Sequence, residues 1–267
     1  MATKPRILIG IPCLVEGRVF RAFDQAVALT CARPREEFEI INQAPYFSMS
    51  GVVPGARNRI VRQAIAIGAD YIWMLDDDQP FDPGTIERAG DLDRLFARQL
   101  EAVIPLSVRR GSPFFPLIYD SVDGEGDKKW QARQHYMQDH EAGLIRVAGA
   151  GLAGLLMTTE SYRKIGLDGW FEFVHSPGAI DDYAEDFPFY RKMEAANIPL
   201  YCDLDVSFGH RVSSVAFCLK QQGKWVTVLS DTEPYVAFPQ PAVPDDHLRL
   251  ARADELRRIE RNKVWQR

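Results

Sequence analysis

Short apolar runs alternate with helical stripes between Ile7 and Leu106, and this alternation is the feature that most restricts the fold. Four runs read as strands: Ile7–Ile11, Phe38–Ile41, Tyr71–Leu75 and Ala102–Leu106. Three segments between them read as helices: Val19–Thr30, Arg57–Ile67 and Pro83–Leu100. Near-continuous apolar strands are typical of parallel sheets that are covered on both faces. We therefore predict an α/β fold with a Rossmann-like, mainly parallel central sheet flanked by helices.

The second half of the chain is less regular and predicts a smaller, mixed region. The expected strands are Phe114–Tyr119, Leu144–Val147, Leu155–Met157, Pro199–Cys202 and Val206–His210. The expected helices are Thr159–Ile165 and Glu185–Asn197. A proline-rich spacer, Pro239–Pro244, precedes a charged amphipathic helix at Asp246–Trp265. We divide the chain into a main domain, residues 1–238, and a tail, residues 239–267.

Three carboxylates, Asp76, Asp77 and Asp78, end the apolar run that begins at Tyr71. Like charges this close disfavour one another's ionised forms unless a cation lies among them. If the strand persists, Asp76 and Asp78 point to the same side, at the strand end where open α/β sheets bind ligands. A helix cap or a solvated loop would explain one acid. Three acids directly after a buried strand favour a site for Mn²⁺ or Mg²⁺.

Composition argues against several classes of protein. The formal net charge of −5 and the pI near 5.6 do not suit a general nucleic-acid binder, whose surface is usually basic. Four scattered cysteines without a metal-binding spacing indicate free thiols in a reducing compartment, so we expect a cytoplasmic protein. The longest apolar stretch, Val147–Met157, is too short and too rich in glycine to cross a bilayer. No transmembrane segment is therefore expected.

Other candidate residues are weaker on their own. Glu185 and Asp186 could supply a general base, although acids at the start of a helix also complement its dipole. His210 follows a predicted strand, where a neutral imidazole could bind a metal, but a lone histidine is more often structural. Arg57 and Asn58 begin a helix, and the arginine could offset a diphosphate or simply face solvent.

Three further residues are expected on the acceptor side. Gly151 belongs to a glycine-rich loop, Gly149–Gly154, which we expect to approach a substrate closely. Trp170 could line an acceptor pocket, although buried core aromatics are the commoner case. Arg191 follows Asp186 by five residues in the same predicted helix.

Taken in order, these segments resemble a glycosyltransferase of the GT-A fold, most like the family 2 type and its phage and bacterial relatives. The resemblance spans Arg6 to Arg211, and the order and spacing of the motifs carry it. Its features are the strand ending at Pro12, the Arg57-Asn58 helix, Asp76-Asp77-Asp78, the Gly149–Gly154 loop, Glu185-Asp186 with Arg191, and Gly209-His210.

The resemblance implies a UDP- or GDP-linked nucleotide-sugar donor, a hydroxyl acceptor, and Mn²⁺ or Mg²⁺. It implies that residues 1–110 bind the nucleotide and that residues 111–238 hold the acceptor and catalytic groups. The implied metal ligands are Asp76, Asp78 and His210; the donor-binding residues are Pro12, Arg57, Asn58, Asp76 and Asp77; and the catalytic residues are Asp186 and Glu185.

The expected reaction moves a sugar from the donor to the acceptor hydroxyl. If the enzyme inverts, Asp186 deprotonates this hydroxyl, which attacks the anomeric carbon in line; the sequence leaves inversion and retention open. Two other classes also stay open: a sugar-phosphate nucleotidyltransferase, and a non-catalytic module that binds carbohydrate or nucleotide-sugar. The helix at Asp246–Trp265 could mediate assembly into a homo-oligomer.

Overall fold

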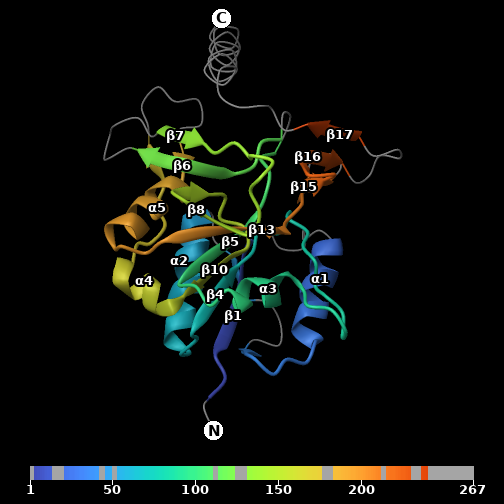
Figure 1. The fold of residues 1–267 in the computed structure, drawn as a ribbon. Helices are drawn as coiled ribbons and strands as arrows, with labels where there is room; N and C mark the ends of the chain where they lie inside the picture. Colours follow the sequence, from blue (N-terminus) through green and yellow to red (C-terminus); the bar gives the residue numbers. More distant parts are fainter. Residues whose placement is uncertain are drawn as a thin grey trace, which may run out of the picture.

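A computed structural model describes residues 3–13, 21–41, 46–49, 53–110, 114–123, 131–175, 183–211, 215–229 and 236–239. Its centre is an eight-stranded sheet in the order β2-β1-β4-β10-β5-β13-β8, with β3 also paired to β1 (Figure 1). These strands are β1 (Arg6–Cys13), β2 (Glu39–Ile40), β3 (Tyr46–Met49), β4 (Tyr71–Met74), β5 (Ala102–Leu106), β8 (Leu144–Val147), β10 (Leu155–Thr158) and β13 (Leu200–Ser207).

The central sheet is mixed, which refines the prediction of a mainly parallel sheet. Strand β1 is parallel to β2, β3 and β4, and β5 is parallel to β13. Strand β10 lies antiparallel between β4 and β5, and β8 lies antiparallel on the outside of β13. A tight approach sets the start of β10, because Gly154 has φ +81° and donates its N–H to the Met74 carbonyl at 2.7 Å. The α/β class is confirmed.

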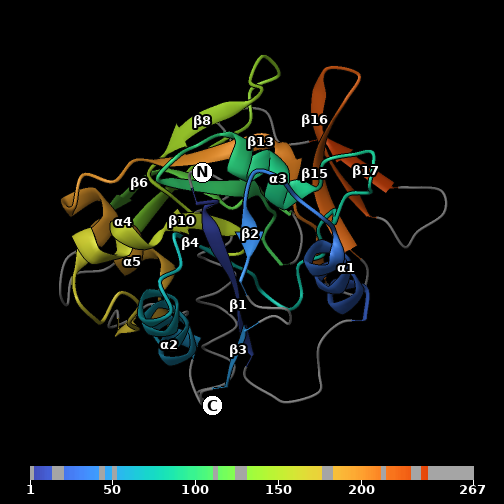
Figure 2. The ribbon, with the colours of Figure 1, turned by 90° about the horizontal axis from the view of Figure 1, so that it is seen from below.

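Helices cover both faces of this sheet (Figures 1 and 2). The five helices of the described residues are α1 (Arg21–Ala32), α2 (Val53–Ala66), α3 (Asp91–Ala97), α4 (Thr159–Ile165) and α5 (Asp186–Ala195). Alternate strand residues serve the two faces, as the period of a strand requires. Leu8 and Ile72 pack with α2, α4 and α5, whereas Ile7 and Trp73 pack with α1 and α3.

The helix predicted at Pro83–Leu100 is wrong in its first half. Helix α3 begins only at Asp91. Before it, the Asp82 carboxylate accepts the Gly84 N–H at 2.9 Å, and Gly84 has φ +76°, a conformation that interrupts a helix. The Asp93 carboxylate accepts the Gly90 N–H at 2.8 Å, which stabilises the later helix start. Local side-chain bonds therefore hold residues 82–90 in a non-helical loop.

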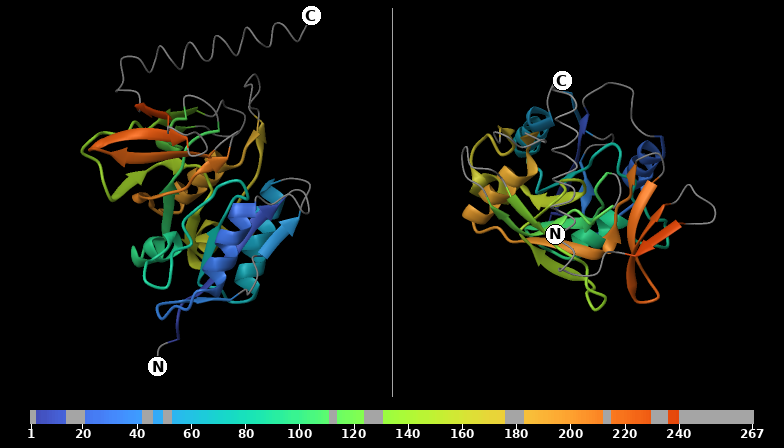
Figure 3. Two further views of the ribbon diagram at one scale, coloured as in Figure 1. Left: turned by 90° about the vertical axis from the view of Figure 1, so that its right-hand side faces the viewer. Right: turned by 90° about the horizontal axis from the view of Figure 1, so that it is seen from above.

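Three smaller sheets complete the second half, and sequence reasoning found them only in part. One contains β6 (Ile118–Asp123), β7 (Gln131–Gln134) and β9 (Gly149–Ala150), a second contains β11 (Val174–His175) and β12 (Tyr183–Ala184), and a third contains β14 (His210–Arg211), β15 (Val215–Gln221), β16 (Lys224–Leu229) and β17 (Val236–Pro239). The third sheet lies to one side of the central sheet (Figure 3). The strand predicted at Phe114–Tyr119 begins instead at Ile118, and the two predicted around 199–210 are mostly the single strand β13.

Most of the tail, with the predicted helix at Asp246–Trp265 and its possible role in oligomer formation, lies outside the described residues. Among the residues that are described, no helix has the length and apolar character needed to cross a membrane. The core instead consists of two apolar layers, one on each face of the central sheet.

Candidate functional site

A hollow of about 370 Å³ opens beyond the end of β4, and we call it the acidic pocket. It is formed where loops after β4 and β5 meet the loop before β10, the start of α5 and the start of β14. Its lining residues are Arg57, Asp76, Asp78, Gln79, Arg110, Leu117, Gly151, Leu152, Glu185, Asp186 and His210. Ligands of open α/β sheets bind at such carboxyl ends of strands.

Arg57 is the buried cation of the acidic pocket. Its side chain is 4% exposed, and Nη2 donates to Asp76 Oδ1 at 2.8 Å, while Nε lies 3.6 Å from Glu185 Oε1. Burial disfavours the charge, but Asp76 and Glu185 outweigh this effect, so the pKa of Arg57 stays above its ordinary value. Nη1 is buried and has no hydrogen-bond partner among the described residues. Arg57 thus joins two carboxylates and retains an N–H group that no described residue accepts.

Asp78 and His210 meet on another wall of the acidic pocket. His210 Nδ1 lies 2.6 Å from the Val108 carbonyl oxygen, and this contact places the proton on Nδ1. Nε2 is then an acceptor, 3.6 Å from Asp78 Oδ2 and 3.3 Å from Arg110 Nε. Arg110 also forms an ion pair with Asp78. Burial and Arg110 lower the pKa of His210, so its imidazole is neutral at pH 7.

Asp186, the first residue of α5, has the ionisation of a general base. Burial, and then the neighbouring Glu185, raise its pKa to about 7, although the Phe187 N–H donates to Asp186 Oδ1 at 3.0 Å and opposes the shift. The side chain is only half-buried at the pocket wall. A carboxylate that titrates near neutral pH can exchange a proton with a substrate hydroxyl.

The donor atoms fit a divalent metal only in part. Within the described ranges, no three Asp, Glu, His or Cys side chains are grouped so that they could hold a metal ion. Asp78 and His210 are nevertheless a carboxylate and an imidazole, which Mn²⁺ accepts, and the Nδ1 contact of His210 resembles that of metal-binding histidines. Asp76 faces Arg57 instead. The pair fits a metal whose other ligands come from a substrate.

The alternation that would place Asp76 and Asp78 on one side of a strand does not apply, because β4 ends at Met74. The two carboxylates lie in the loop that follows and pair with different arginines, Arg57 and Arg110. Asp77 is not among the residues that line the acidic pocket. Two of the three acids, Asp76 and Asp78, do line the pocket, but the loop after β4 decides where their side chains point.

Four other expected residues lie away from the acidic pocket. Asn58 donates to the Phe171 carbonyl oxygen at 2.7 Å and accepts the Phe171 N–H at 2.9 Å, so it fixes a neighbouring loop. Trp170 is 1% exposed in the core. Arg191 pairs with Glu194 on the outside of α5. Pro12 is buried in β1 and does not line the pocket.

Sequence reasoning missed two polar residues of the acidic pocket. Arg110 lies in the loop after β5, which ends at Leu106, so a search for charges in the loops that follow buried strands could have found it. Gln79 is 4% exposed, and its Oε1 has no hydrogen-bond partner within the described part of the chain. A single amide in a loop carries no such signal.

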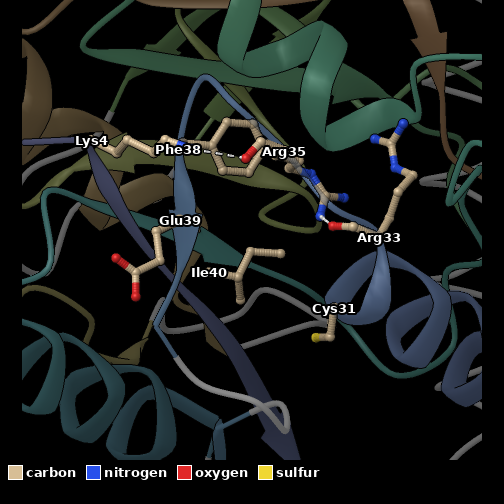
Figure 4. A pocket seen from close by; sticks show the side chains of 7 residues that line it. All are labelled: Lys4, Cys31, Arg33, Arg35, Phe38, Glu39 and Ile40. Atoms are coloured by element: carbon tan, nitrogen blue, oxygen red, sulfur yellow. Dashed lines mark hydrogen bonds between the residues drawn. The ribbon is translucent and has the colours of Figure 1, made fainter. Parts of the chain in front are cut away.

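A second hollow, of about 320 Å³, lies beside the start of β2, and we call it the arginine hollow. Figure 4 shows its lining residues, Lys4, Cys31, Arg33, Arg35, Phe38, Glu39 and Ile40, with the Arg33 guanidinium pointing toward α3. Both Arg33 and Arg35 pair with Asp93 of α3. Arg35 Nη1 also donates to the carbonyls of Thr30 at 2.6 Å and Arg33 at 2.8 Å, which closes the end of α1.

The sequence matches no protein-family model and no curated protein. Among solved structures, the crystal structure of A197 from STIV aligns with a TM-score of 0.49 and 14% sequence identity, over 91% of this chain and 99% of that chain. A likeness of this size indicates neither a shared family nor a shared activity. The candidate site therefore depends on its own geometry.

Proposed function

We propose that this protein is a glycosyltransferase that moves a sugar from a nucleoside-diphosphate donor to an acceptor hydroxyl with the help of Mn²⁺ or Mg²⁺. One observation carries the proposal: acids and a histidine from three distant parts of the chain, Asp76 and Asp78, Glu185 and Asp186, and His210, line one pocket. The proposal also agrees with the GT-A resemblance of the sequence, in which the same residues have assigned roles.

A donor diphosphate would meet two guanidiniums in the acidic pocket and would need a cation to offset the four carboxylates. Arg57 and Arg110 both line the pocket, and guanidinium groups bind phosphate oxygens through charge-assisted hydrogen bonds. Asp78 and His210 would hold the metal, with diphosphate oxygens as further ligands. The metal would supply positive charge that makes the diphosphate a better leaving group.

Asp186 is the proposed general base. With a pKa near 7, it is largely ionised at mildly basic pH and basic enough to take the acceptor proton as the hydroxyl attacks the anomeric carbon. Glu185, beside it, holds Arg57 through the 3.6 Å contact. In this proposal Glu185 positions Arg57, and Asp186 carries out the proton transfer.

The test is calorimetric titration of UDP and GDP into the wild type and Asp78→Ala, with and without Mn²⁺. We expect one nucleotide to bind in a way that needs both Mn²⁺ and Asp78. The product then separates the enzyme classes, because slow hydrolysis of the sugar nucleotide should release free sugar and nucleoside diphosphate. Release of pyrophosphate during turnover would point to a nucleotidyltransferase. Absence of metal-dependent binding for both nucleotides would overturn the proposal.

A further inference from the structure

A single guanidinium contacts both groups that we propose as metal ligands. Arg110 forms an ion pair with Asp78, and its Nε lies 3.3 Å from His210 Nε2. Because His210 Nδ1 is committed to the Val108 carbonyl, Nε2 presents its lone pair to Arg110. The planar guanidinium of Arg110 thus pairs with the Asp78 carboxylate through Nη2 and donates to the His210 imidazole through Nε. A divalent metal would use the same two acceptors.

Exposure distinguishes Arg110 from its two partners. The Arg110 side chain is 64% exposed, whereas the side chains of Asp78 and His210 are 24% and 10% exposed. The two acceptors therefore belong to the pocket wall, and the cation reaches them from the solvent side. An ion pair that is so accessible is worth little to folding, typically below about 1 kcal/mol. We therefore expect Arg110 to leave its partners at a small cost in the free energy of unfolding.

We infer that Arg110 is a built-in counter-ion, which the metal displaces from Asp78 and His210 and which then binds the diphosphate. This inference depends on the proposed function for the identity of the anion, but not for the competition with the metal. Arg110 would be a positioning residue with two alternative partners. Its release has an electrostatic cause, because a doubly charged ion beside Asp78 repels the guanidinium.

The inference has a thermodynamic consequence for the order of binding. Metal alone must break the contacts of Arg110, so it should bind weakly. When a nucleoside diphosphate is present, the displaced guanidinium gains a new anionic partner, so metal and nucleotide should bind with positive coupling. The coupling must be the same whichever ligand is added first. Arg57, which is buried and paired with Asp76, cannot move in this way.

The test compares the wild type with Arg110→Gln, using Mn²⁺ alone as the first probe and electron paramagnetic resonance to count free Mn²⁺. We expect Arg110→Gln to bind Mn²⁺ about three- to tenfold more tightly than the wild type, since the competing cation is gone. With saturating Mn²⁺, the same variant should bind UDP or GDP about tenfold more weakly. Opposite changes in the two affinities are the signature of a residue that exchanges partners.

Two further variants make the result specific. Arg133→Gln removes another exposed arginine, whose side chain is 72% exposed and whose Nε lies 3.6 Å from Asp120 Oδ2. This variant should leave Mn²⁺ affinity unchanged. Arg110→Lys keeps the charge but cannot bridge two acceptors, so its Mn²⁺ affinity should lie between that of the wild type and that of Arg110→Gln. The melting temperature of each variant reports whether it folds.

The inference is overturned if Arg110→Gln binds Mn²⁺ no more tightly than the wild type. Failure of the proposed function looks different: neither UDP nor GDP binds the wild type at saturating Mn²⁺, whatever the variant does with the metal. Tighter Mn²⁺ binding by Arg110→Gln together with no nucleotide binding by the wild type would support the competition and overturn the diphosphate as the second partner.

Discussion

The acidic pocket and the arginine hollow are similar in size, and each is lined by two arginines. They differ in the number of carboxylates that surround these arginines. In the arginine hollow, Asp93 takes both guanidiniums, and backbone carbonyls at the end of α1 accept further N–H groups. In the acidic pocket, four carboxylates surround two guanidiniums. Among the described residues, both contain buried N–H groups without a hydrogen bond, on Arg35 and on Arg57.

The difference teaches that an unsatisfied buried group does not by itself mark a site. Arg35 holds the end of a helix, and burial together with Arg33 lowers its pKa to about 10. In the acidic pocket, four carboxylates outnumber two guanidiniums, and burial, followed by the neighbouring Glu185, raises the pKa of Asp186 to about 7. Charges that exceed what the fold can neutralise are the better indication of a ligand. The following predictions test this distinction.

The largest effect is expected for Asp186→Asn, which removes the proposed base. The rate of sugar transfer should fall by about 10²–10⁴, with little change in nucleotide affinity. For the wild type, kcat should rise as the pH increases through about 7, because the base must be ionised. Steady-state kinetics between pH 5.5 and 8.5 measure both. An unchanged kcat in Asp186→Asn would mean that the acidic pocket does not use this carboxylate.

Arg57→Met should be the most destabilising change in the acidic pocket. Two carboxylates, Asp76 and Glu185, would lose the cation between them, and leaving buried charges without a partner costs about 3–5 kcal/mol. Urea denaturation measures the free energy of unfolding. Arg62→Met is the matched control on the same helix, because Arg62 is 52% exposed and its pair with Asp168 should contribute less than about 1 kcal/mol.

Asp93→Asn tests the arginine hollow as a structural element. Arg33 and Arg35, with side chains 12% and 5% exposed, would lose their shared carboxylate, and we expect a loss of about 2–4 kcal/mol in the free energy of unfolding. Binding of Mn²⁺ and nucleotide should not change. Titration of inorganic phosphate into the wild type by calorimetry is the control. Binding at the arginine hollow would contradict its purely structural role, because this hollow would then be a ligand site as well.

Asp186→Asn should also stabilise the protein at basic pH. Below the ordinary pKa of 3.8 the carboxyl is neutral in both the folded and the unfolded state. Between 3.8 and about 7 folding takes up a proton, so wild-type stability falls as the pH rises, and the loss is complete above about 7. The variant should gain about 1–3 kcal/mol at pH 8, and less toward pH 4.5, in thermal melts. A gain that is independent of pH would contradict the assignment.

The smallest effect is expected for Arg191→Ala. Arg191 is 42% exposed and pairs with Glu194 one helical turn away, so its removal should change the free energy of unfolding by less than about 0.5 kcal/mol. Transfer activity should stay within twofold of the wild type. A large loss of activity would restore the expectation from sequence that this residue serves the acceptor.

Individual helices and strands show how much of the fold could be predicted from the sequence. The pattern of apolar residues placed β5 and α4 with their bounds, because a buried strand and a capped helix leave local signals. It overextended α3, since the side-chain bonds of Asp82 and Asp93 decided where that helix starts. The resemblance assigned Asn58 to the donor, whereas this side chain holds the backbone of Phe171. Trp170 was a candidate for an acceptor pocket, and it lies in the core.

The sequence by itself determined the α/β class, the three acids that follow a buried strand, and the candidate status of Asp76, Asp78, Asp186 and His210. The class and the acids after the strand depend on periodicity and residue type, which are local properties of the chain, whereas Asp186 and His210 became candidates through the order of motifs in the GT-A resemblance. Only the tertiary structure decided that β10 lies antiparallel between β4 and β5, that Arg57 and Arg110 take separate carboxylates, and which residues share a pocket. Contacts between residues far apart in the chain depend on packing, and no local pattern encodes them.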